Sequence, residues 1–261
     1  MAGHTPNIKD GFELGVMREA GRITHLSMME AAKAVRPGIS TGELDDIARA
    51  LMVKMGATPT FIGYPPGAKY PFQHTCCISL NEEIVHGIPS KKRILKEGDI
   101  VSIDIGATYK GYVGDCAITV PVGRISAKAQ KLIDATRESL DAAMAVMKPG
   151  GLVSTIGRTV QGYAEERGFS VVRNYCGHGV GRELHEAPQV PNYYDPKLIS
   201  GDVVLKPGLV LAVEPMLCEG TYDTQILNDH WTVVTKDRKL SAHWENTIAI
   251  TKDGCEILTR P

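Results

Sequence analysis

Four acidic residues stand at the ends of apolar, strand-like runs of this chain. Asp104 lies within the run 100–107, and Asp115 opens another apolar run eleven residues later. Glu214 ends the run Leu-Val-Leu-Ala-Val, and Glu245 precedes Asn-Thr-Ile-Ala-Ile-Thr. A carboxylate in a buried strand is costly unless it is paired or bound to metal, although a single aspartate there could also cap a turn. Because like charges on neighbouring antiparallel strands repel unless a cation lies between them, the four together predict a metal site.

The charge and ligand types of such a site indicate its chemistry. Four carboxylates carry four negative charges, which two divalent cations would neutralise. His178, in a glycine-rich segment after an expected strand, can add one imidazole nitrogen. Oxygen ligands with one nitrogen suit Mn²⁺, Fe²⁺, Co²⁺ or Zn²⁺ better than a thiolate site would. A two-metal site of this kind activates a water molecule, so these residues indicate a hydrolase.

Two further histidines stand in matching surroundings. His86 and His185 each lie three residues before a proline, Pro89 and Pro188 respectively. Either could be an ordinary loop histidine. Their matched placement favours two histidines that flank the metals and hydrogen-bond a substrate carbonyl or a tetrahedral intermediate.

Two other motifs do not fit the chemistry that they usually mark. Segment 38–42 matches G-x-S-x-G, but a nucleophile elbow needs a strand before it, and here a helix precedes Ser40. The glycines of segment 177–181 lack the G-x-G-x-x-G spacing, and Pro188 follows where a helix should run. A serine hydrolase and a dinucleotide-binding loop are therefore disfavoured.

The elements that must position the acidic residues occur twice along the chain. Helices are predicted where helical periodicity runs between capping and stop signals, over 13–35, 40–56, 127–147 and 154–167. Ser40 and Glu43 have the spacing of a capping box at the second helix. Strands are predicted over 100–105, 112–120, 171–175, 210–214, 231–235 and 246–251.

Short matches between the two halves occur in the same order. The matched pairs are 35–40 with 147–152, 86–89 with 185–188, 95–104 with 205–214, and 115–119 with 245–249. Their offsets vary from 99 to 130 residues, as expected when loops between equivalent elements differ in length. We interpret this as duplication within a single catalytic domain, residues 1–261, with pseudo-repeats of about 13–122 and 127–258. Helices before strands in each half predict an α/β (α+β) sheet fold with the site between the halves.

Composition excludes several classes of protein. The 261 residues carry a net charge of −1 and only 6% aromatic residues, so no basic field or stacking platform for nucleic acid is expected. Apolar stretches of about five residues are too short for a membrane span, and the first ten residues lack a signal peptide's apolar run. The six cysteines form no C-x-x-C pair. We therefore expect reduced thiols in a cytoplasmic protein that binds neither DNA nor membrane.

From about residue 8 to residue 259, the chain resembles the type I methionine aminopeptidases, whose fold is called pita-bread. The resembling blocks are 37–45, 77–82, 86–89, 103–104, 114–115, 175–182, 185–190, 214–216, 231–233 and 245–248. The resemblance implies two pseudo-symmetric halves with an antiparallel sheet covered by helices. It also implies removal of the initiator methionine from nascent polypeptides with a small second residue.

By this resemblance, two divalent metal ions (Co, Mn, Fe(II), Zn or Ni) bind five ligands. These ligands are Asp104, Asp115, His178, Glu214 and Glu245. Asp115 and Glu245 would bridge the ions, and a water or hydroxide between the ions would attack the scissile carbonyl. Glu214 would shuttle a proton, while His86 and His185 would contact the substrate amide and stabilise the intermediate.

The family's methionine pocket is lined by aromatic residues and a cysteine. Cys77 and Trp231 match directly, and Phe61, Tyr64 and Tyr70 are near-matches because the loop 61–73 is longer than in bacterial members. The chain departs from the family at two positions. Leu184 stands where Phe is usual, and Asn246 stands where His is common.

Two rival functions keep the same fold. Proline-directed peptidases, such as prolidase and aminopeptidase P, usually carry an additional N-terminal domain, for which the first helix leaves no room. A non-catalytic pita-bread binding module would have lost ligands, whereas all five are present. Gaps of 36 and 31 residues between His178, Glu214 and Glu245 cannot house the extra subdomain of type II enzymes. We therefore expect a monomer that acts near the ribosome exit, with segment 91–93 as a contact.

Overall fold

The computed structural model describes residues 6–196 and 202–261. Its helices are α1 (Gly11–Ala34), α2 (Thr41–Lys54), α3 (Ala127–Val146) and α4 (Val153–Glu165). All begin and end within two residues of their predicted bounds. The capping box of α2 is confirmed, since the Ser40 hydroxyl accepts from the Glu43 amide at 3.2 Å and the Glu43 carboxylate accepts from the Ser40 amide at 2.9 Å.

The main sheet is curved and antiparallel. Its strands are β1 (Thr58–Pro59), β2 (Cys76–Leu80), β4 (Ile100–Tyr109), β5 (Tyr112–Pro121), β7 (Gly177–Gly179), β8 (Glu186–Val190), β9 (Val210–Val213), β14 (Glu245–Ile250) and β15 (Cys255–Ile257). Their order is β1-β4-β5-β14-β9-β7-β8, with β2 also beside β4 and β15 beside β14. Strands β5 and β14 therefore join the two halves of the chain.

Two smaller sheets complete the fold. One has the order β13-β10-β6, with β13 (Ser241–His243), β10 (Met216–Cys218) and β6 (Ser170–Val171). The other has the order β11-β12-β3, with β11 (Thr224–Ile226), β12 (Val233–Thr235) and β3 (Glu83–Val85).

Two predicted strands are shorter than expected. The strand predicted over 171–175 is only β6, because β10 begins at Met216 and its last hydrogen bond to this segment is from the Val172 amide to the Met216 carbonyl, at 3.1 Å. The strand predicted over 231–235 begins at Val233, because the Asp229 carboxylate accepts from the amides of Trp231 and Thr232 in a turn. Local side-chain hydrogen bonding thus overrides the strand propensity of Trp231.

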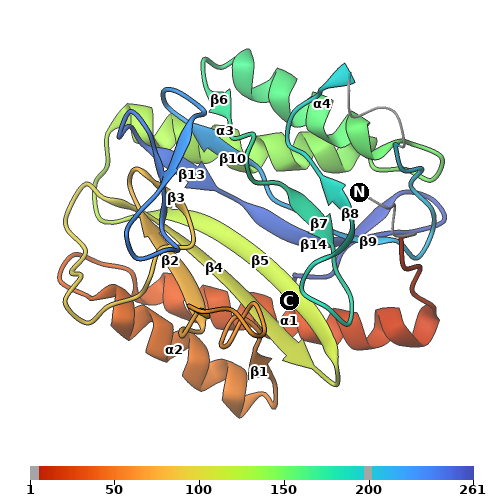
Figure 1. Ribbon diagram of the computed structural model, residues 1–261, viewed down its shortest axis with the longest axis horizontal. Coiled ribbons are helices and arrows are strands. Elements are labelled where there is room, and N and C mark those ends of the chain that lie inside the picture. Colours follow the sequence, from red (N-terminus) through yellow and green to blue (C-terminus); the bar gives the residue numbers. More distant parts are fainter. Residues whose placement is uncertain (1–5, 197–201) are drawn as a thin grey trace.

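The helices are arranged in two pairs, with strands between them (Figure 1). Helices α1 and α2 bury Ile23 and Leu44 in one apolar cluster with residues of β2, β4 and β5. Helices α3 and α4 bury Leu132 and Ile156 in a second cluster with residues of β9 and β14. This architecture confirms the predicted α/β pita-bread fold, whereas duplication within one catalytic domain stays a prediction. Within the described ranges, no helix is long and apolar enough to cross a membrane.

A glycine contact brings α1 close to the strand that carries Asp115. A Cβ atom on Gly114 would lie 2.7 Å from the Cα of Gly21 in α1. Gly114 must therefore lack a side chain for α1 to pack this closely on β5, whereas a Cβ atom on Gly21 would lie 2.3 Å from the Leu258 carbonyl oxygen. The close packing helps to bury Asp115, whose exposed fraction is 4%.

Candidate active site

Residues that lie opposite one another on adjacent strands of the main sheet form rows across it. The predicted ligands belong to two neighbouring rows on one face of this sheet. In the first row, Asp104 of β4 lies opposite Ala117 of β5, which in turn lies opposite Glu245 of β14. The pair Asn246–Val213 ends the ladder between β14 and β9, so Glu214 follows directly beyond it. Because Ala117 has only a methyl group, space remains between the flanking carboxylates.

The second row contains His178 and Asp115, and Thr247 lies between them and hydrogen-bonds the main chain of Asp115. His178 of β7 lies opposite Ala212 of β9, and Ala212 lies opposite Thr247 of β14. The Thr247 hydroxyl accepts from the Asp115 amide at 2.9 Å and donates to the Asp115 carbonyl at 2.8 Å. Asp115 and Ala117 are two residues apart, so both rows occupy the same face.

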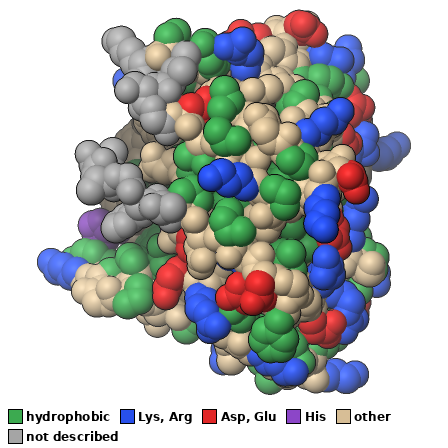
Figure 2. Space-filling model, turned by 90° about the vertical axis from the view of Figure 1, so that its right-hand side faces the viewer, with side chains coloured by type: hydrophobic (Ala, Val, Ile, Leu, Met, Phe, Trp, Pro, Cys, Tyr) green, Lys and Arg blue, Asp and Glu red, His purple; other side chains and the backbone are tan. Residues whose placement is uncertain are grey.

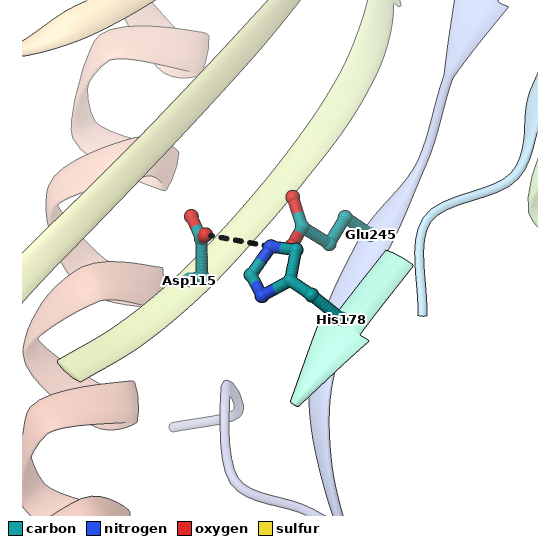
Figure 3. Close-up of side chains that lie close together, drawn as sticks. All are labelled: Asp115, His178 and Glu245. Carbon is teal, nitrogen blue, oxygen red and sulfur yellow. Dashed lines mark ion pairs between the residues drawn. The ribbon is translucent and has the colours of Figure 1, made fainter. Parts of the chain in front are cut away.

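Three of the ligand side chains point toward one another from β5, β7 and β14 (Figure 3). One ligand atom from each of Asp115, His178 and Glu245 lies within 4.8 Å of the others. His178 Nε2 lies 3.8 Å from Asp115 Oδ2 and 3.6 Å from Glu214 Oε1. These two separations are too long for hydrogen bonds but fit atoms that share one ion at about 2.1 Å each.

The hydrogen-bonding state of these side chains also fits a metal. Asp115 Oδ1 and Glu245 Oε1 are buried and have no hydrogen-bond partner among the described residues. His178 Nδ1 lies 2.9 Å from the Gly179 carbonyl oxygen, which can only accept. Nδ1 therefore carries the proton, and the lone pair of Nε2 is directed at the carboxylates as a metal ligand requires.

Burial controls the charges in this group. It raises the pKa of Asp104 to about 7 and that of Glu214 to about 8. Burial and the neighbouring carboxylates raise the pKa values of Asp115 and Glu245 well above the ordinary range. Burial lowers the pKa of His178 to about 3, so its imidazole is neutral. A divalent cation would compensate the carboxylate charges and release the protons that the carboxyl groups otherwise hold.

A cavity of about 220 Å³ lies beside these side chains. Its polar lining consists of Asp104, Asp115, His178, Glu214, Glu245, His86 and His185. Its less polar lining consists of Phe61, Tyr64, Phe72, Val85, Cys77, Tyr175, Cys176, Leu184 and Trp231. The cavity therefore joins a carboxylate and histidine site to a largely apolar pocket.

One predicted pocket residue lies elsewhere. The side chain of Tyr70 is not part of the cavity lining: the residue is 48% exposed, and its ring stacks on His230 with centroids 4.3 Å apart. Tyr70 instead contributes its carbonyl, which accepts from Trp231 Nε1 at 2.9 Å. Phe72, rather than Tyr70, lines the cavity, and its ring lies edge-on to that of Trp231 with centroids 5.2 Å apart. The aromatic content of loop 61–73 was the available signal for Phe72, but it could not distinguish Phe72 from Tyr70.

The two outer histidines face the cavity from opposite halves of the chain. His86 lies edge-on to Trp231, and burial lowers its pKa to about 4. His185 contacts the His178 ring, with centroids 4.2 Å apart, and its Nδ1 is hydrogen-bonded to the Tyr64 hydroxyl. In the arrangement in which the phenol donates to Nδ1, His185 carries its proton on Nε2.

Sequence reasoning missed a third histidine near the carboxylates. His243 ends β13 and is buried, and burial lowers the pKa of its imidazole. Its Nε2 lies 3.6 Å from Glu214 Oε2 and 4.0 Å from Glu245 Oε2. Its position two residues before Glu245 was the one available signal. Asn246 instead accepts from the Thr259 hydroxyl at 3.0 Å and does not line the cavity.

The basic segment 91–93 lies outside the cavity lining. Lys91 forms an ion pair with Asp46, and Arg93 forms one with Glu83. On the face shown in Figure 2, Lys and Arg side chains are mixed with Asp, Glu and hydrophobic side chains.

Comparison with known proteins agrees with this geometry. The pattern of metallopeptidase family M24 matches residues 15–252. Methionine aminopeptidase 1 of Bacillus subtilis (strain 168) is 52% identical over 248 residues, which cover 95% of this chain and 96% of the relative. The chain belongs to metallopeptidase family M24, among its methionine aminopeptidases. The family is thus a metal-dependent one, and the buried carboxylates fit that requirement.

Solved structures show the same fold. The crystal structure of methionine aminopeptidase from Thermotoga maritima matches with a TM-score of 0.94 and 40% identity, covering 98% of this chain and all of that one. The prolidase from Pyrococcus horikoshii OT3 matches with a TM-score of 0.76 and 27% identity, covering 97% of this chain but 63% of that one. The resemblance to methionine aminopeptidases and the pita-bread fold are thereby confirmed.

Proposed function

We propose that this chain is a metal-dependent aminopeptidase that removes the N-terminal methionine from polypeptides with a small second residue. The observation that carries the proposal is the cavity itself, in which a carboxylate and histidine cluster adjoins a pocket lined largely by aromatic and other apolar side chains. Names and full-length similarity of the relatives support the same reaction.

The metal site consists of the two rows of ligands. The proposed ligands, which would hold two divalent ions, are Asp104, Asp115, His178, Glu214 and Glu245. Such ions, when bound, would supply a water molecule activated as a nucleophile at neutral pH. Their identity is set by supply in the cell as well as by the ligands, which suit Mn, Fe(II), Co, Zn and Ni.

The protein's own groups position the substrate and move protons. His185, with its proton on Nε2, donates to the carbonyl oxygen of the scissile bond as charge develops there, and His86 contacts the same amide from the other side. Glu214, which lines the cavity beside the other proposed ligands, takes a proton from the attacking water and gives it to the departing amine. The first transfer requires that Glu214 is ionised, which the charge of the bound metal favours.

The apolar part of the cavity selects the side chain. Phe61, Phe72 and Trp231 present aromatic edges and faces to an unbranched thioether, which gains sulfur–aromatic contacts there. Tyr64 and Leu184 close the side next to His185. An apolar pocket discriminates between side chains by only about 1–3 kcal/mol per methylene, so selection of an N-terminal methionine over an N-terminal leucine is partial. A charged N-terminal side chain is excluded, because its burial would be costly.

The test is release of free methionine from Met-Ala-Ser and Met-Leu-Ser by metal-free protein titrated with Mn²⁺, Fe²⁺, Co²⁺ and Zn²⁺. We expect release from Met-Ala-Ser that saturates near one or two ions per chain, and little release from Met-Leu-Ser. Asp104→Asn keeps the shape of the side chain but removes a ligand charge, and should nearly abolish release. Normal turnover by this variant would refute the ligand assignment.

Proline-directed cleavage is the alternative that the prolidase likeness raises. It is tested in the same assay with Ala-Pro and Ala-Pro-Ser peptides. Cleavage of these peptides without release from Met-Ala-Ser would replace the proposal. Absence of any cleavage and of any bound metal would instead favour a binding module.

The protein is proposed to act as a cytoplasmic monomer on nascent chains near the ribosome exit. The exposed Lys92 tests the contact, because the ion pairs of Lys91 and Arg93 would be disturbed by substitution. Lys92→Glu should weaken cosedimentation with ribosomes, whereas the matched control Lys252→Glu, also exposed, should not. Equal cosedimentation of both variants with wild type would remove segment 91–93 from the proposal.

A further inference from the structure

His243 has no role in the proposed reaction, although it lies beside two of the proposed ligands. It is 1% exposed, and it is not among the residues that line the cavity. Its Nε2 is buried without a hydrogen-bond partner in the described part of the chain. Most buried polar groups are hydrogen-bonded, so this nitrogen requires an explanation.

The two oxygens of Glu214 face different histidines. Oε1 lies 3.6 Å from Nε2 of His178, which lines the cavity, and Oε2 lies 3.6 Å from Nε2 of His243, which does not. His243 Nε2 also lies 4.0 Å from Glu245 Oε2. The imidazole of His243 therefore contacts the sides of the carboxylates that are turned away from the cavity.

The backbone of His243 is held tightly from the neighbouring sheet. The Thr119 hydroxyl accepts from the His243 amide at 2.9 Å and donates to the His243 carbonyl at 2.8 Å. Ser102 lies 2.8 Å from Thr119 through the two hydroxyl oxygens, so Ser102 can donate to it. Because the main chain is fixed, only a small movement of the ring or of the Glu214 side chain is needed to bring Nε2 and Oε2 within hydrogen-bond distance.

We propose that His243 is a positioning residue that donates a hydrogen bond from Nε2 to Glu214, and alternatively to Glu245, and so orients these carboxylates toward the metal ions. The inference rests on the proposed metal site. It adds a hydrogen-bond partner to the proposed ligands. Carboxylates that bind metal commonly need partners that do not themselves bind the metal, and loss of one typically weakens metal binding 10- to 100-fold. A neutral imidazole suffices for this role, so no change of charge is involved.

Two substitutions separate the donor role from bulk. His243→Leu fills similar space without a donor, and His243→Gln keeps an N–H donor. Titration of the metal-free proteins with Mn²⁺ by calorimetry should give a dissociation constant about 10- to 100-fold higher for His243→Leu and within about threefold of wild type for His243→Gln. His25→Gln, a half-buried histidine of α1 outside the cavity, is the matched control and should bind as wild type does.

Thermal unfolding with and without Mn²⁺ distinguishes positioning from mere packing. Positioning predicts that His243→Leu keeps the melting temperature of the metal-free protein but gains less from Mn²⁺ than wild type gains. If the Leu variant loses only metal-free stability and keeps its Mn²⁺ affinity, the proposal is overturned. Equal loss of affinity in the Leu and Gln variants would also overturn it, in favour of direct imidazole ligation.

A measurement on the unsubstituted protein covers the case in which a variant does not fold. Nitrogen NMR of the zinc-loaded wild type should show His243 with a protonated Nε2, whereas a deprotonated, metal-bound Nε2 would overturn the proposal. Wild type that binds neither Mn²⁺ nor Zn²⁺ would refute the proposed function together with this inference. Wild type that binds both ions, with an unaffected His243→Leu variant, would refute the inference alone.

Discussion

Thr247 should be essential both for stability and for metal binding, and replacement by valine tests this at constant shape. Thr247 is fully buried, and its hydroxyl is the partner of both the amide and the carbonyl of Asp115. Valine leaves both of these main-chain groups without that partner beside a buried carboxylate. One unsatisfied buried group costs about 1–3 kcal/mol, so the pair costs roughly 2–6 kcal/mol.

The expected change is large enough for simple assays. For a chain of this size, about 1 kcal/mol shifts the melting temperature by about 2–4 °C, so Thr247→Val should lower it by on the order of 10 °C. Thr247→Ser is the matched control: it keeps the hydroxyl and loses one methyl group, at a cost of about 1 kcal/mol. Urea denaturation of the metal-free proteins measures the same difference as a free energy of unfolding.

Metal binding provides a second readout of the same substitution. Since Asp115 is anchored through its main chain by Thr247, the valine variant should also bind Mn²⁺ more weakly than the serine variant. The reasoning would be refuted if Thr247→Val melted within about 2 °C of Thr247→Ser in the absence of metal. It would also fail if the serine variant lost as much Mn²⁺ affinity as the valine variant.

Three further predictions concern charge, tautomer and an ion pair. Burial raises the pKa of Asp104 to about 7 from an unfolded value near 4, so the free energy of unfolding of the metal-free protein falls as pH rises from about 4 to about 7 and then levels off. The melting temperature in EDTA should therefore fall between about pH 5 and 7, and the gain from Mn²⁺ should grow over the same range, whereas a pH-independent gain would contradict this. Tyr64→Phe removes the hydroxyl on His185 Nδ1 and should lower kcat about 2- to 10-fold with little change in KM, and unchanged steady-state kcat would count against this tautomer. Lys9 and Glu186 form a nearly buried pair at 2.6 Å, so Lys9→Met should cost about 3–5 kcal/mol in urea denaturation, and a loss under 1 kcal/mol would contradict the role of the pair.

Local sequence signals were sufficient to predict the helices and to select the proposed metal ligands. A capping box such as Ser40 with Glu43 acts over three residues, so the start of α2 could be located without tertiary information. The proposed ligands could be selected because an acidic residue at the end of an apolar strand is costly without a partner. That cost makes Asp104 and Glu214 conspicuous in the sequence, whatever the register of their strands.

Strand lengths and neighbours depended on contacts between distant segments. The strand predicted from residue 171 ended after Val171 because β10 begins at Met216, whose carbonyl accepts from the Val172 amide and which leaves no strand partner for the residues that follow. Trp231 left its predicted strand because the turn at Asp229 satisfied its amide. In both places the apolar pattern was present, but hydrogen bonding that the pattern does not encode decided the outcome.

The sequence by itself determined the fold class, the reaction class and the set of residues that could bind metal, because these depend on residue type, spacing and local capping. Only the tertiary structure decided which aromatic residue of loop 61–73 enters the cavity. Trp231 binds the carbonyl of Tyr70, 161 residues away in sequence, and Phe72 rather than Tyr70 lies in the pocket. The roles of Thr247 and His243 likewise became visible only once β14 was paired with β5 and β13 of the neighbouring sheet was placed against β5. Their roles depend on distances across the sheet, which no local pattern in the chain specifies.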